Sequence, residues 1–218
     1  MTKIALFAGG DLTYFEYDFD YFVGIDRGSL FLLKNGLSLD MAVGDFDSIT
    51  EDELLYIKHY CSNIVSASAE KNDTDTELAL KTIFKEFPEA QVTVFGAFGG
   101  RIDHMMSNIF LPSDRDLEPF MSQIRLKDEQ NIVTYLPSGK NQVSRIEGMS
   151  YVSFMPESES TLQISGAKYE LNKSNYFKKK MYSSNEFMTS PIEVELKDGY
   201  LIIIYSCLLY TSPSPRDS

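Results

Sequence analysis

The sequence predicts an α/β domain with an open parallel sheet, followed by a small all-β sandwich domain. Up to about Pro112, short apolar runs recur between segments of helical periodicity, which is typical of alternating strands and helices. Beyond it, alternating apolar and polar runs follow one another with turn residues between them, as in antiparallel strands. The polar connection SDRDLEPFM separates the two patterns, so we expect an α/β domain over residues 1–115 and an all-β domain over residues 122–206.

The composition is that of a globular chain and limits the choice of partners. Of its 218 residues, 43% are hydrophobic and 24% are charged, which predicts a substantial core. The net charge of -12 repels nucleic-acid backbones and anionic membranes, so we expect neither as a partner. The apolar stretch at the N-terminus is too short for a secretory signal, and Cys61 and Cys207 are too few for a disulfide framework. We therefore expect a cytoplasmic protein.

Five apolar runs in the first half predict buried strands: KIALFAGG, YFVGID, MAVGDFD, NIVSAS and QVTVFGA. Two of the segments between them carry helix start signals. Thr50 with Glu53, and Thr74 with Glu77, have the spacing of a capping box, in which each side chain bonds the backbone amide of the other residue. We therefore expect helices over EDELLYIKHY and ELALKTIFKEF.

The second half predicts an antiparallel sandwich or roll. Its expected strands are NIVTYLP, SYVSFMP, TLQISGA, KKKMYSS, PIEVEL and YLIIIYS. The last residues, CLLYTSPSPRDS, break the strand pattern and end in a Ser- and Pro-rich string. We expect residues 207–218 to form a disordered or artefactual tail.

Charged residues follow the apolar runs of the first half. Because ligands bind at the carboxyl ends of parallel strands, these loops are expected to converge on one rim and to carry the chemistry. The loops contain Asp26; Asp45 and Asp47; Lys71, Asp73 and Asp75; and Arg101 and Asp103. Several carboxylates at one rim repel one another unless a cation neutralises them.

The pair in MAVGDFDSIT predicts a magnesium site, since Mg²⁺ takes carboxylate oxygens together with substrate phosphates. We expect Asp45 and Asp47 to hold the ion and Gly44 to let the backbone turn at the strand end. Asp73 is the expected third ligand. In the alternative interpretation, Asp47 and Ser48 only cap the next helix.

The segment EKNDTDTELAL repeats the acidic arrangement at another strand-to-helix loop. Asp73 or Asp75 is expected to complete the metal shell or to orient a nucleophilic hydroxyl, with Lys71 countering phosphate charge. The alternative is that both aspartates serve only the helix start.

The segment VFGAFGGRIDHMMSNIFL predicts a strand, a turn containing Gly99 and Gly100, and a helix. Spacings of three and four place Arg101, His104 and Asn108 on one helical face, near the end of the helix that favours anions. No GKS or GKT follows the glycines, so this is not a P-loop. A hydrogen-bonded structural histidine is the alternative for His104. The expected core residues of this helix and its continuation are Met105, Met106, Ile109, Phe110 and Leu111.

Together, GDFDSI, KNDTDTELAL and FGAFGGRIDHMMSNI, followed by an all-β half, closely resemble thiamin pyrophosphokinases of the bacterial type. The resemblance extends to about Ser206. It implies transfer of the pyrophosphoryl group of ATP to the hydroxyl of thiamin, giving thiamin diphosphate and AMP, with Mg²⁺ as cofactor. It also implies a homodimer in which the nucleotide-binding domain of one subunit meets the β domain of its partner at the thiamin site.

The resemblance implies roles for individual residues. Asp45 and Asp47 match the magnesium-binding pair of the family and Asp26 its early aspartate near the nucleotide, while YSSNEF resembles a short motif near the thiamin pocket. The remaining matches are Asp73 and Asp75 with the second acidic pair; Arg101, Asp103, His104 and Asn108 with the phosphate segment; and Ser184 and Asn185 with the pocket motif.

Three other functions compete with this interpretation. The run DFDSI also looks like the nucleophile motif of haloacid dehalogenase-type phosphatases, although that motif normally lies on the first strand. A magnesium-dependent nucleotide hydrolase would use water as the acceptor. A non-catalytic module would sense a nucleotide at the acidic rim without turnover.

Overall fold

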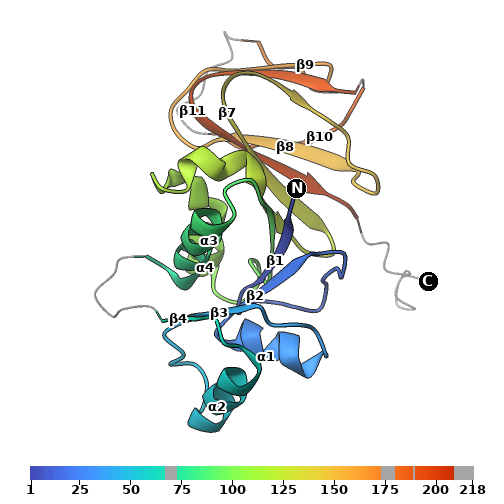
Figure 1. Ribbon diagram of the computed structural model, residues 1–218. Helices are drawn as coiled ribbons and strands as arrows, with labels where there is room; N and C mark the ends of the chain where they lie inside the picture. Colours follow the sequence, from blue (N-terminus) through green and yellow to red (C-terminus); the bar gives the residue numbers. More distant parts are fainter. Residues whose placement is uncertain (67–72, 173–179, 189, 209–218) are drawn as a thin grey trace, which may run out of the picture. The chain divides into compact units, whose positions relative to one another are not determined.

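The computed structural model describes residues 1–66, 73–172, 180–188 and 190–208 (Figure 1). The chain divides into two compact units. The first comprises residues 1–129 and 133–135, and the second comprises residues 130–132 and the chain from residue 136 onward. The expected tail lies outside the described residues, apart from Cys207 and Leu208.

The first unit is a parallel sheet with the strand order β6-β5-β1-β2-β3-β4. Each of its five strand pairs is parallel. The five runs expected from the sequence correspond to five of its strands: β1 (Lys3–Phe7), β2 (Tyr21–Ile25), β3 (Met41–Gly44), β4 (Ile64–Ser66) and β5 (Gln91–Phe95). The order steps outward from β1 to β4 and then returns to place β5 on the other side of β1. This reversal leaves a crevice at the carboxyl ends of β1 and β5.

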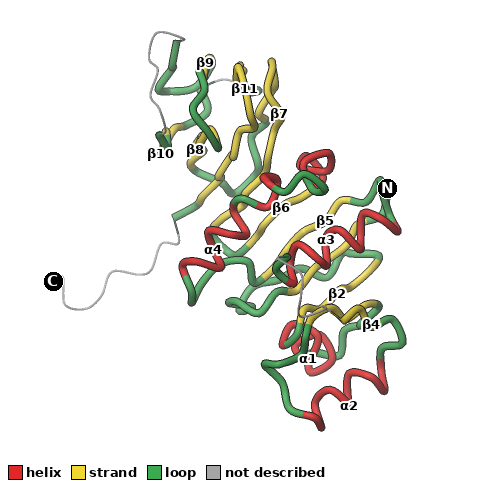
Figure 2. Tube along the Cα trace, turned by 90° about the vertical axis from the view of Figure 1, so that its left-hand side faces the viewer, coloured by secondary structure: helices red, strands yellow, loops and turns green. Residues whose placement is uncertain are grey.

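Helices cover the sheet on both faces (Figure 2). They are α1 (Arg27–Lys34), α2 (Glu51–Tyr60), α3 (Asp75–Glu86) and α4 (Ile102–Ile109). Leu30 and Leu32 of α1 and Ile57 of α2 share one buried cluster with Ala5 and Phe7 of β1. Figure 2 shows α1 and α2 on one side of the strands and α3 on the other, so the unit has three layers.

Both capping boxes expected from the sequence are confirmed. The amide of Glu53 donates to Thr50 Oγ1 and the carboxylate of Glu53 accepts from the amide of Thr50, at the start of α2. Thr74 and Glu77 exchange the same two bonds at the start of α3. These bonds satisfy amides that have no partner within the helix and fix where each helix begins.

The first unit extends past the boundary expected near residues 112 to 122. After α4 come two short 3₁₀ helices, η1 (Leu111–Ser113) and η2 (Glu118–Gln123), and then the strand β6 (Ile124–Lys127). β6 pairs in parallel with β5, so it belongs to the parallel sheet of the first unit. The four-residue run IRLK is too short and too polar to predict a strand from the sequence. It is a strand in the structure because it pairs with β5.

The second unit is an antiparallel β structure made from most of β7 (Asn131–Val143), whose residues 133–135 belong to the first unit, and from four further strands. These are β8 (Tyr151–Pro156), β9 (Leu162–Ser165), β10 (Tyr182–Asn185) and β11 (Ile192–Ser206). β8 pairs antiparallel with both β10 and β11, and β9 pairs with β11. Its core gathers residues from all of the longer strands, including Val152, Phe154, Ile164, Val194 and Ile203.

The two runs expected as separate strands, PIEVEL and YLIIIYS, form one strand, β11. Its first part pairs with β9 and its second part with β8. The core-facing residues change from even numbers, such as Val194, to odd numbers, such as Ile203, across KDGY. The polar break in the sequence therefore marks a shift of the inward face and not the end of a strand.

The core prediction for α4 is partly wrong. Leu111 is buried and Met105, Ile109 and Phe110 are partly buried, but 41% of Met106 is exposed. Asn108 is the one residue of α4 that is buried. Apolar periodicity alone does not reveal which face of a helix its neighbours cover.

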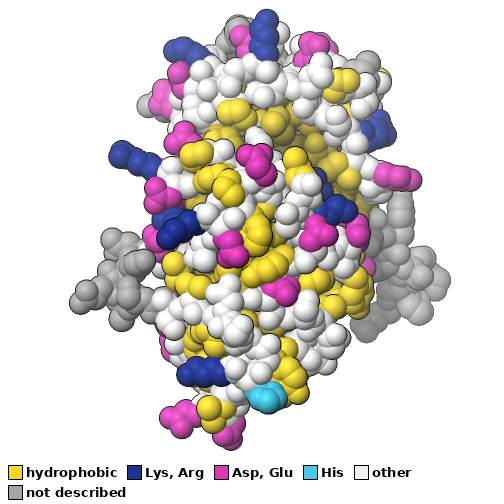
Figure 3. All heavy atoms as spheres, in the orientation of Figure 1, with side chains coloured by type: hydrophobic (Ala, Val, Ile, Leu, Met, Phe, Trp, Pro, Cys, Tyr) yellow, Lys and Arg dark blue, Asp and Glu magenta, His cyan; other side chains and the backbone are white. Residues whose placement is uncertain are grey.

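The described part of the chain contains no helix that is long and apolar enough to cross a membrane. On the face drawn in Figure 3, Lys and Arg side chains are interspersed with Asp and Glu side chains.

The loops after β1 and β5 lie in direct backbone contact. The amide of Ala8 donates to the carbonyl of Phe95 at 2.9 Å, and the amide of Gly10 donates to that of Gly96 at 3.0 Å. A Cβ atom on Gly10 would lie 2.3 Å from the carbonyl oxygen of Gly96 and 2.6 Å from that of Phe98. A glycine at position 10 is therefore needed for the two loops to approach this closely.

We expect Gly10→Ala to lower the free energy of unfolding by roughly 2 kcal/mol or more, because the two loops must separate to admit the methyl group. Gly9→Ala is the matched control, since a Cβ atom there meets nothing within 4 Å. Urea unfolding of both variants measures the difference. Equal stability of the two variants would contradict the close contact between the loops.

Candidate active site

A cleft of about 700 Å³ lies at the carboxyl ends of the parallel strands, at the crevice that the strand order predicts. Loops after β1, β2, β3 and β5, the start of α3 and the first turns of α4 line it. The lining residues are Ala8, Gly9, Gly10, Ile25, Asp26, Arg27, Ser48, Thr74, Asp75, Thr76, Gly96, Ala97, Gly99, Gly100, Arg101, Asp103, His104, Ser107 and Asn108.

Three carboxylates meet beside this cleft. One oxygen of each of Asp26, Asp45 and Asp47 lies within 4.8 Å of one oxygen of the other two. The parallel pairing of Ile25 with Val43 places the residue after β2 next to the loop after β3. The convergence expected from the sequence therefore holds for these two loops.

The backbone holds Asp26 in an unusual conformation, with φ 43° and ψ -112°. Its amide donates to the carbonyl of Val43 at 3.1 Å, and its Oδ1 accepts from the amide of Phe46 at 3.1 Å. A Cβ atom on Gly44 would lie 2.0 Å from this Oδ1. Gly44 therefore makes room for the Asp26 carboxylate, besides ending β3.

The carboxylates at the cleft destabilise one another's charged forms. Burial raises the pKa of Asp26 to about 6, with further contributions from Asp75, Asp45 and Asp47. Burial also raises the pKa of Asp75, and the nearby charges of Asp45 and Asp47 add to the effect. Asp75 is the first residue of α3 and lies within the electrostatic range of the cluster. Such a set of oxygen donors suits a hard divalent cation.

Asp73 lies apart from the cluster of Asp26, Asp45 and Asp47, although the sequence suggests it as the third metal ligand. Its Oδ1 accepts a hydrogen bond from Lys81 Nζ at 3.0 Å. Asp26 occupies the third position of the cluster instead. The sequence pattern alone does not show that Asp73 pairs with a lysine in the following helix.

Arg101 and Asp103 form a fork at the start of α4. Arg101 Nε donates to Asp103 Oδ1 at 3.1 Å and Nη2 donates to Oδ2 at 2.5 Å. The hydrogen bond from Arg101 lowers the pKa of Asp103 to about 2. Both side chains are more than half exposed, so the guanidinium group remains accessible to an anion in the cleft.

The helical face expected from the sequence is present, because Arg101, His104 and Asn108 all line the cleft. They differ in burial. His104 is exposed, whereas Asn108 is buried and its side-chain amide donates to the carbonyl of Ala97 at 2.9 Å. Asn108 therefore anchors the loop after β5 to α4. Gly99 and Gly100 in that loop also line the cleft.

Sequence reasoning missed several lining residues because it followed the acidic loops. Gly9 and Gly10 come from the loop after β1, where the run KIALFAGGD already gave a signal of a strand followed by glycines. Arg27 is a second cation at the cleft, and its Nε donates to the carbonyl of Ser48 at 3.2 Å. Its position directly after Asp26 in YFVGIDRG was the available signal.

The sequence suggests three further site residues, Lys71, Ser184 and Asn185. Lys71 lies outside the described residues. Ser184 and Asn185 belong to the second unit. The side chain of Asn185 is buried, donates to the carbonyl of Tyr169 at 2.8 Å and accepts from its amide at 2.9 Å, so it supports the local fold. Ser184 has φ 58°, and its amide donates to Ser153 Oγ at 3.2 Å.

The phosphatase alternative loses support from the topology. The run DFDSI follows β3, the third strand of the chain, whereas the dehalogenase-type motif normally follows the first. The first carboxylate after β1 is that of Asp11, which follows Ala8, Gly9 and Gly10 and accepts from the amide of Thr13 at 2.9 Å, so no aspartate stands directly at the end of the first strand.

Comparison with known proteins gives one consistent match. Residues 14–120 match the family model described as thiamin pyrophosphokinase, catalytic domain, and residues 140–201 match that described as thiamin pyrophosphokinase, vitamin B1 binding domain. A thiamine pyrophosphokinase of Bacillus subtilis (strain 168) is 34% identical over 215 residues, which span 94% of this chain and 99% of that protein.

Solved structures agree with these matches. A thiamin pyrophosphokinase family protein from Enterococcus faecalis has a TM-score of 0.88 at 36% identity, over 95% of this chain and 100% of that chain. Thiamin pyrophosphokinase from Candida albicans has a TM-score of 0.72 at 17% identity, over 94% of this chain and 89% of that chain, and so shares the fold. The two family models and the relatives that span nearly the whole chain show that this protein belongs to the thiamin pyrophosphokinase family.

Proposed function

We propose that the protein transfers the pyrophosphoryl group of ATP to the hydroxyl of thiamin, forming thiamin diphosphate and AMP. Membership of the family supports this reaction. The observation in the structure that carries it is the carboxylate cluster of Asp26, Asp45 and Asp47 beside a cleft lined by two arginines. A cleft that offers both metal ligands and phosphate-binding cations suits a polyphosphate substrate.

Asp26, Asp45 and Asp47 are the proposed ligands of Mg²⁺. Three carboxylate oxygens within 4.8 Å of one another match the ligands that this ion prefers. Bound there, Mg²⁺ would neutralise charge on the polyphosphate and polarise its oxygens. Gly44 contributes by leaving space for the Asp26 carboxylate.

Arg101 and Arg27 are the proposed phosphate contacts. Both line the cleft, and Arg101 is held by Asp103 with its guanidinium exposed. His104 and the first amides of α4 lie on the same wall and favour an anion there. Gly9, Gly10, Gly99 and Gly100 have no side chains, so a phosphate group can approach the backbone of both loops closely.

Asp75 is the proposed group that orients the thiamin hydroxyl. It lines the cleft, and burial raises its pKa, which makes it a stronger proton acceptor than an ordinary aspartate. The hydroxyl oxygen attacks the β-phosphorus of ATP, its proton passes to a carboxylate oxygen of Asp75, and AMP leaves. Asp73 lies outside the metal cluster and is paired with Lys81, so Asp75 is preferred for this role.

The thiamin pocket is proposed to involve the second unit, where Ser184 and Asn185 occur in YSSNEF and a vitamin B1 binding domain model matches residues 140–201. A homodimer and a cytoplasmic location stay predictions. Measurement of the molar mass in solution would test the homodimer.

The first test is to incubate the protein with ATP, Mg²⁺ and thiamin and to follow AMP and thiamin diphosphate by chromatography. We expect equal amounts of both products, formed only when thiamin is present. ADP or phosphate without thiamin diphosphate would favour the nucleotide hydrolase. Tight ATP binding without any turnover would favour the sensing module.

We expect Asp26→Asn to stabilise the metal-free protein at pH 8 by about 1 to 3 kcal/mol and to abolish its stabilisation by Mg²⁺. The folded chain binds the Asp26 proton more tightly than the unfolded chain, because the pKa is raised to about 6. The stability due to this proton is therefore present at about pH 4 and is lost as the pH rises through 6. The asparagine Oδ1 can still accept from the amide of Phe46.

Thermal unfolding at pH 8 and pH 4.5, with and without Mg²⁺, measures these effects. Glu89→Gln is the matched control, since Glu89 is exposed in the turn between α3 and β5. Equal stabilisation by Mg²⁺ of wild type and Asp26→Asn would remove Asp26 from the proposed metal ligands.

We expect Arg101→Lys to lower kcat/KM for ATP by roughly tenfold or more, since an ammonium group cannot make the paired contacts of a guanidinium. Steady-state kinetics with ATP varied measures the change. Arg115→Lys, at an exposed arginine outside the cleft lining, is expected to leave kcat/KM unchanged. Equal constants for Arg101→Lys and wild type would give Arg101 a purely structural role.

A further inference from the structure

Lys81 meets three carboxylates that come from two different segments of the first unit. Its Nζ lies 2.7 Å from Asp114 Oδ2, 3.0 Å from Asp73 Oδ1 and 3.7 Å from Asp116 Oδ2. About 20% of the side chains of Lys81 and Asp114 is exposed, compared with 78% for Asp116. The two short contacts are therefore partly shielded from solvent, where an ion pair is stronger than on the surface.

The two short contacts reach both walls of the cleft. Asp73 directly precedes Thr74–Thr76, which lines the cleft on the α3 side. Asp114 follows η1, which continues directly from α4, the helix that carries Arg101 and His104 on the other wall. Lys81 itself lies in the middle of α3. One ammonium group thus joins the start of α3 to the segment that leaves α4.

Backbone bonds spread each contact through its segment. Asp114 accepts from the amide of Asp116 through Oδ1, and its carbonyl accepts from the amides of Leu117 and Glu118. On the other side, Asp73 adjoins Thr74, the residue that caps α3 and accepts from the amide of Glu77. Displacement of the Asp73 or Asp114 carboxylate would therefore disturb the hydrogen-bonded turn around it as well as its own side chain.

The charges make Lys81 necessary for this arrangement. Burial disfavours its charged form, yet hydrogen bonds to Asp114 and Asp73 raise its pKa above the ordinary value. Without the ammonium group, Asp73 and Asp114 would repel each other. Asp73 also lies two residues from Asp75, and the charges of Asp45 and Asp47 already act on that carboxylate. The loss of Lys81 would thus add uncompensated negative charge at the start of α3.

We propose that Lys81 is a positioning residue that fixes the start of α3, and with it the Asp75 carboxylate, relative to α4. It acts by keeping Asp73 away from the metal cluster and bound to the segment after α4. The part of this inference that concerns turnover depends on the proposed function. The positioning itself does not, and it is tested without substrate.

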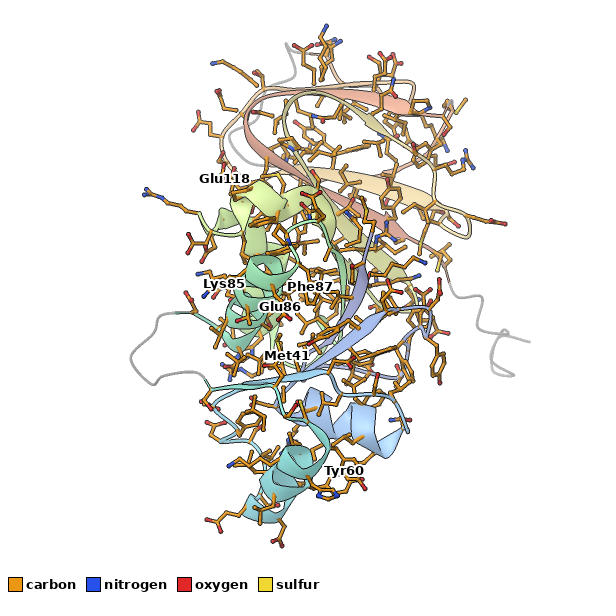
Figure 4. All side chains as sticks on the ribbon, viewed as in Figure 1. Met41, Tyr60, Lys85, Glu86, Phe87 and Glu118 are labelled. Atoms are coloured by element: carbon orange, nitrogen blue, oxygen red, sulfur yellow. The ribbon has the colours of Figure 1, made fainter. Side chains whose placement is uncertain are left out.

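Hydrogen exchange of the metal-free protein tests the positioning. We expect Lys81→Met to speed the exchange of the amides of Glu77, Leu78, Leu117 and Glu118 by roughly tenfold or more, and Lys81→Arg to restore protection. Lys85→Met is the matched control, one turn further along α3 (Figure 4), at an exposed lysine with no ion pair among those described. Unchanged exchange at both segments in Lys81→Met would overturn the proposal.

Kinetics then tests the link to Asp75. We expect Lys81→Met to lower kcat by roughly 10- to 100-fold with little change in KM for ATP, because the hydroxyl-orienting group is displaced while the phosphate contacts on α4 remain. Lys81→Arg should recover most of the rate, and Lys85→Met should match wild type. A loss of protection with unchanged kcat would overturn the role of Lys81 in positioning Asp75.

A double-mutant cycle separates this role from metal binding by Asp73. If Asp73 acts through Lys81, Asp73→Asn and Lys81→Met lower kcat to a similar extent and the double variant loses little more. Additive losses, with weaker binding of Mn²⁺ by Asp73→Asn alone, would make Asp73 a metal ligand and contradict the proposal. If wild type makes no thiamin diphosphate, the proposed function fails, and the exchange experiment still decides whether Lys81 holds the two segments.

Discussion

The repulsion among Asp26, Asp45 and Asp47 is the constraint around which the cleft is arranged. Parallel pairing of β2 with β3 places these carboxylates within 4.8 Å of one another, and burial raises the pKa of Asp26 to about 6. The folded chain tolerates these close carboxylates because Asp26 accepts a hydrogen bond from the amide of Phe46 and because Gly44 leaves space for its side chain. Three carboxylate oxygens this close together are the basis on which we propose Mg²⁺ binding here.

The cations of the cleft are kept separate from these carboxylates. Arg101 is held by Asp103 on α4, and Arg27 bonds the carbonyl of Ser48. Neither forms an ion pair with the Asp26 cluster among the described contacts. Because the two arginines do not pair with the carboxylates among the described contacts, both sets of charges are available to a ligand that carries phosphate together with a metal ion. Such a ligand would neutralise the arginines and the carboxylates at once.

Outside the cleft, the acidic residues of the first unit are also arranged by specific ion pairs. Lys81 binds Asp73 and Asp114, and this divides the acidic residues of the first unit into two groups with different surroundings. Asp75 belongs with the metal cluster through its electrostatic environment, while Asp73 belongs with the segment after α4. Two aspartates only two positions apart thus have different surroundings, because one precedes the helix and the other begins it.

The sequence by itself determined the parallel strands of the first unit, both capping boxes and the acidic rim, because strand period, cap spacing and the position of charge after a strand are local properties. Only the tertiary structure decided that Asp26 and not Asp73 joins Asp45 and Asp47, that β6 belongs to the first sheet, and that β11 is one strand. Each of these depends on a partner distant in the chain: Val43 for Asp26, Lys81 for Asp73, β5 for β6, and β8 and β9 for β11. Such partners are set by packing and pairing across the fold, which no local pattern encodes.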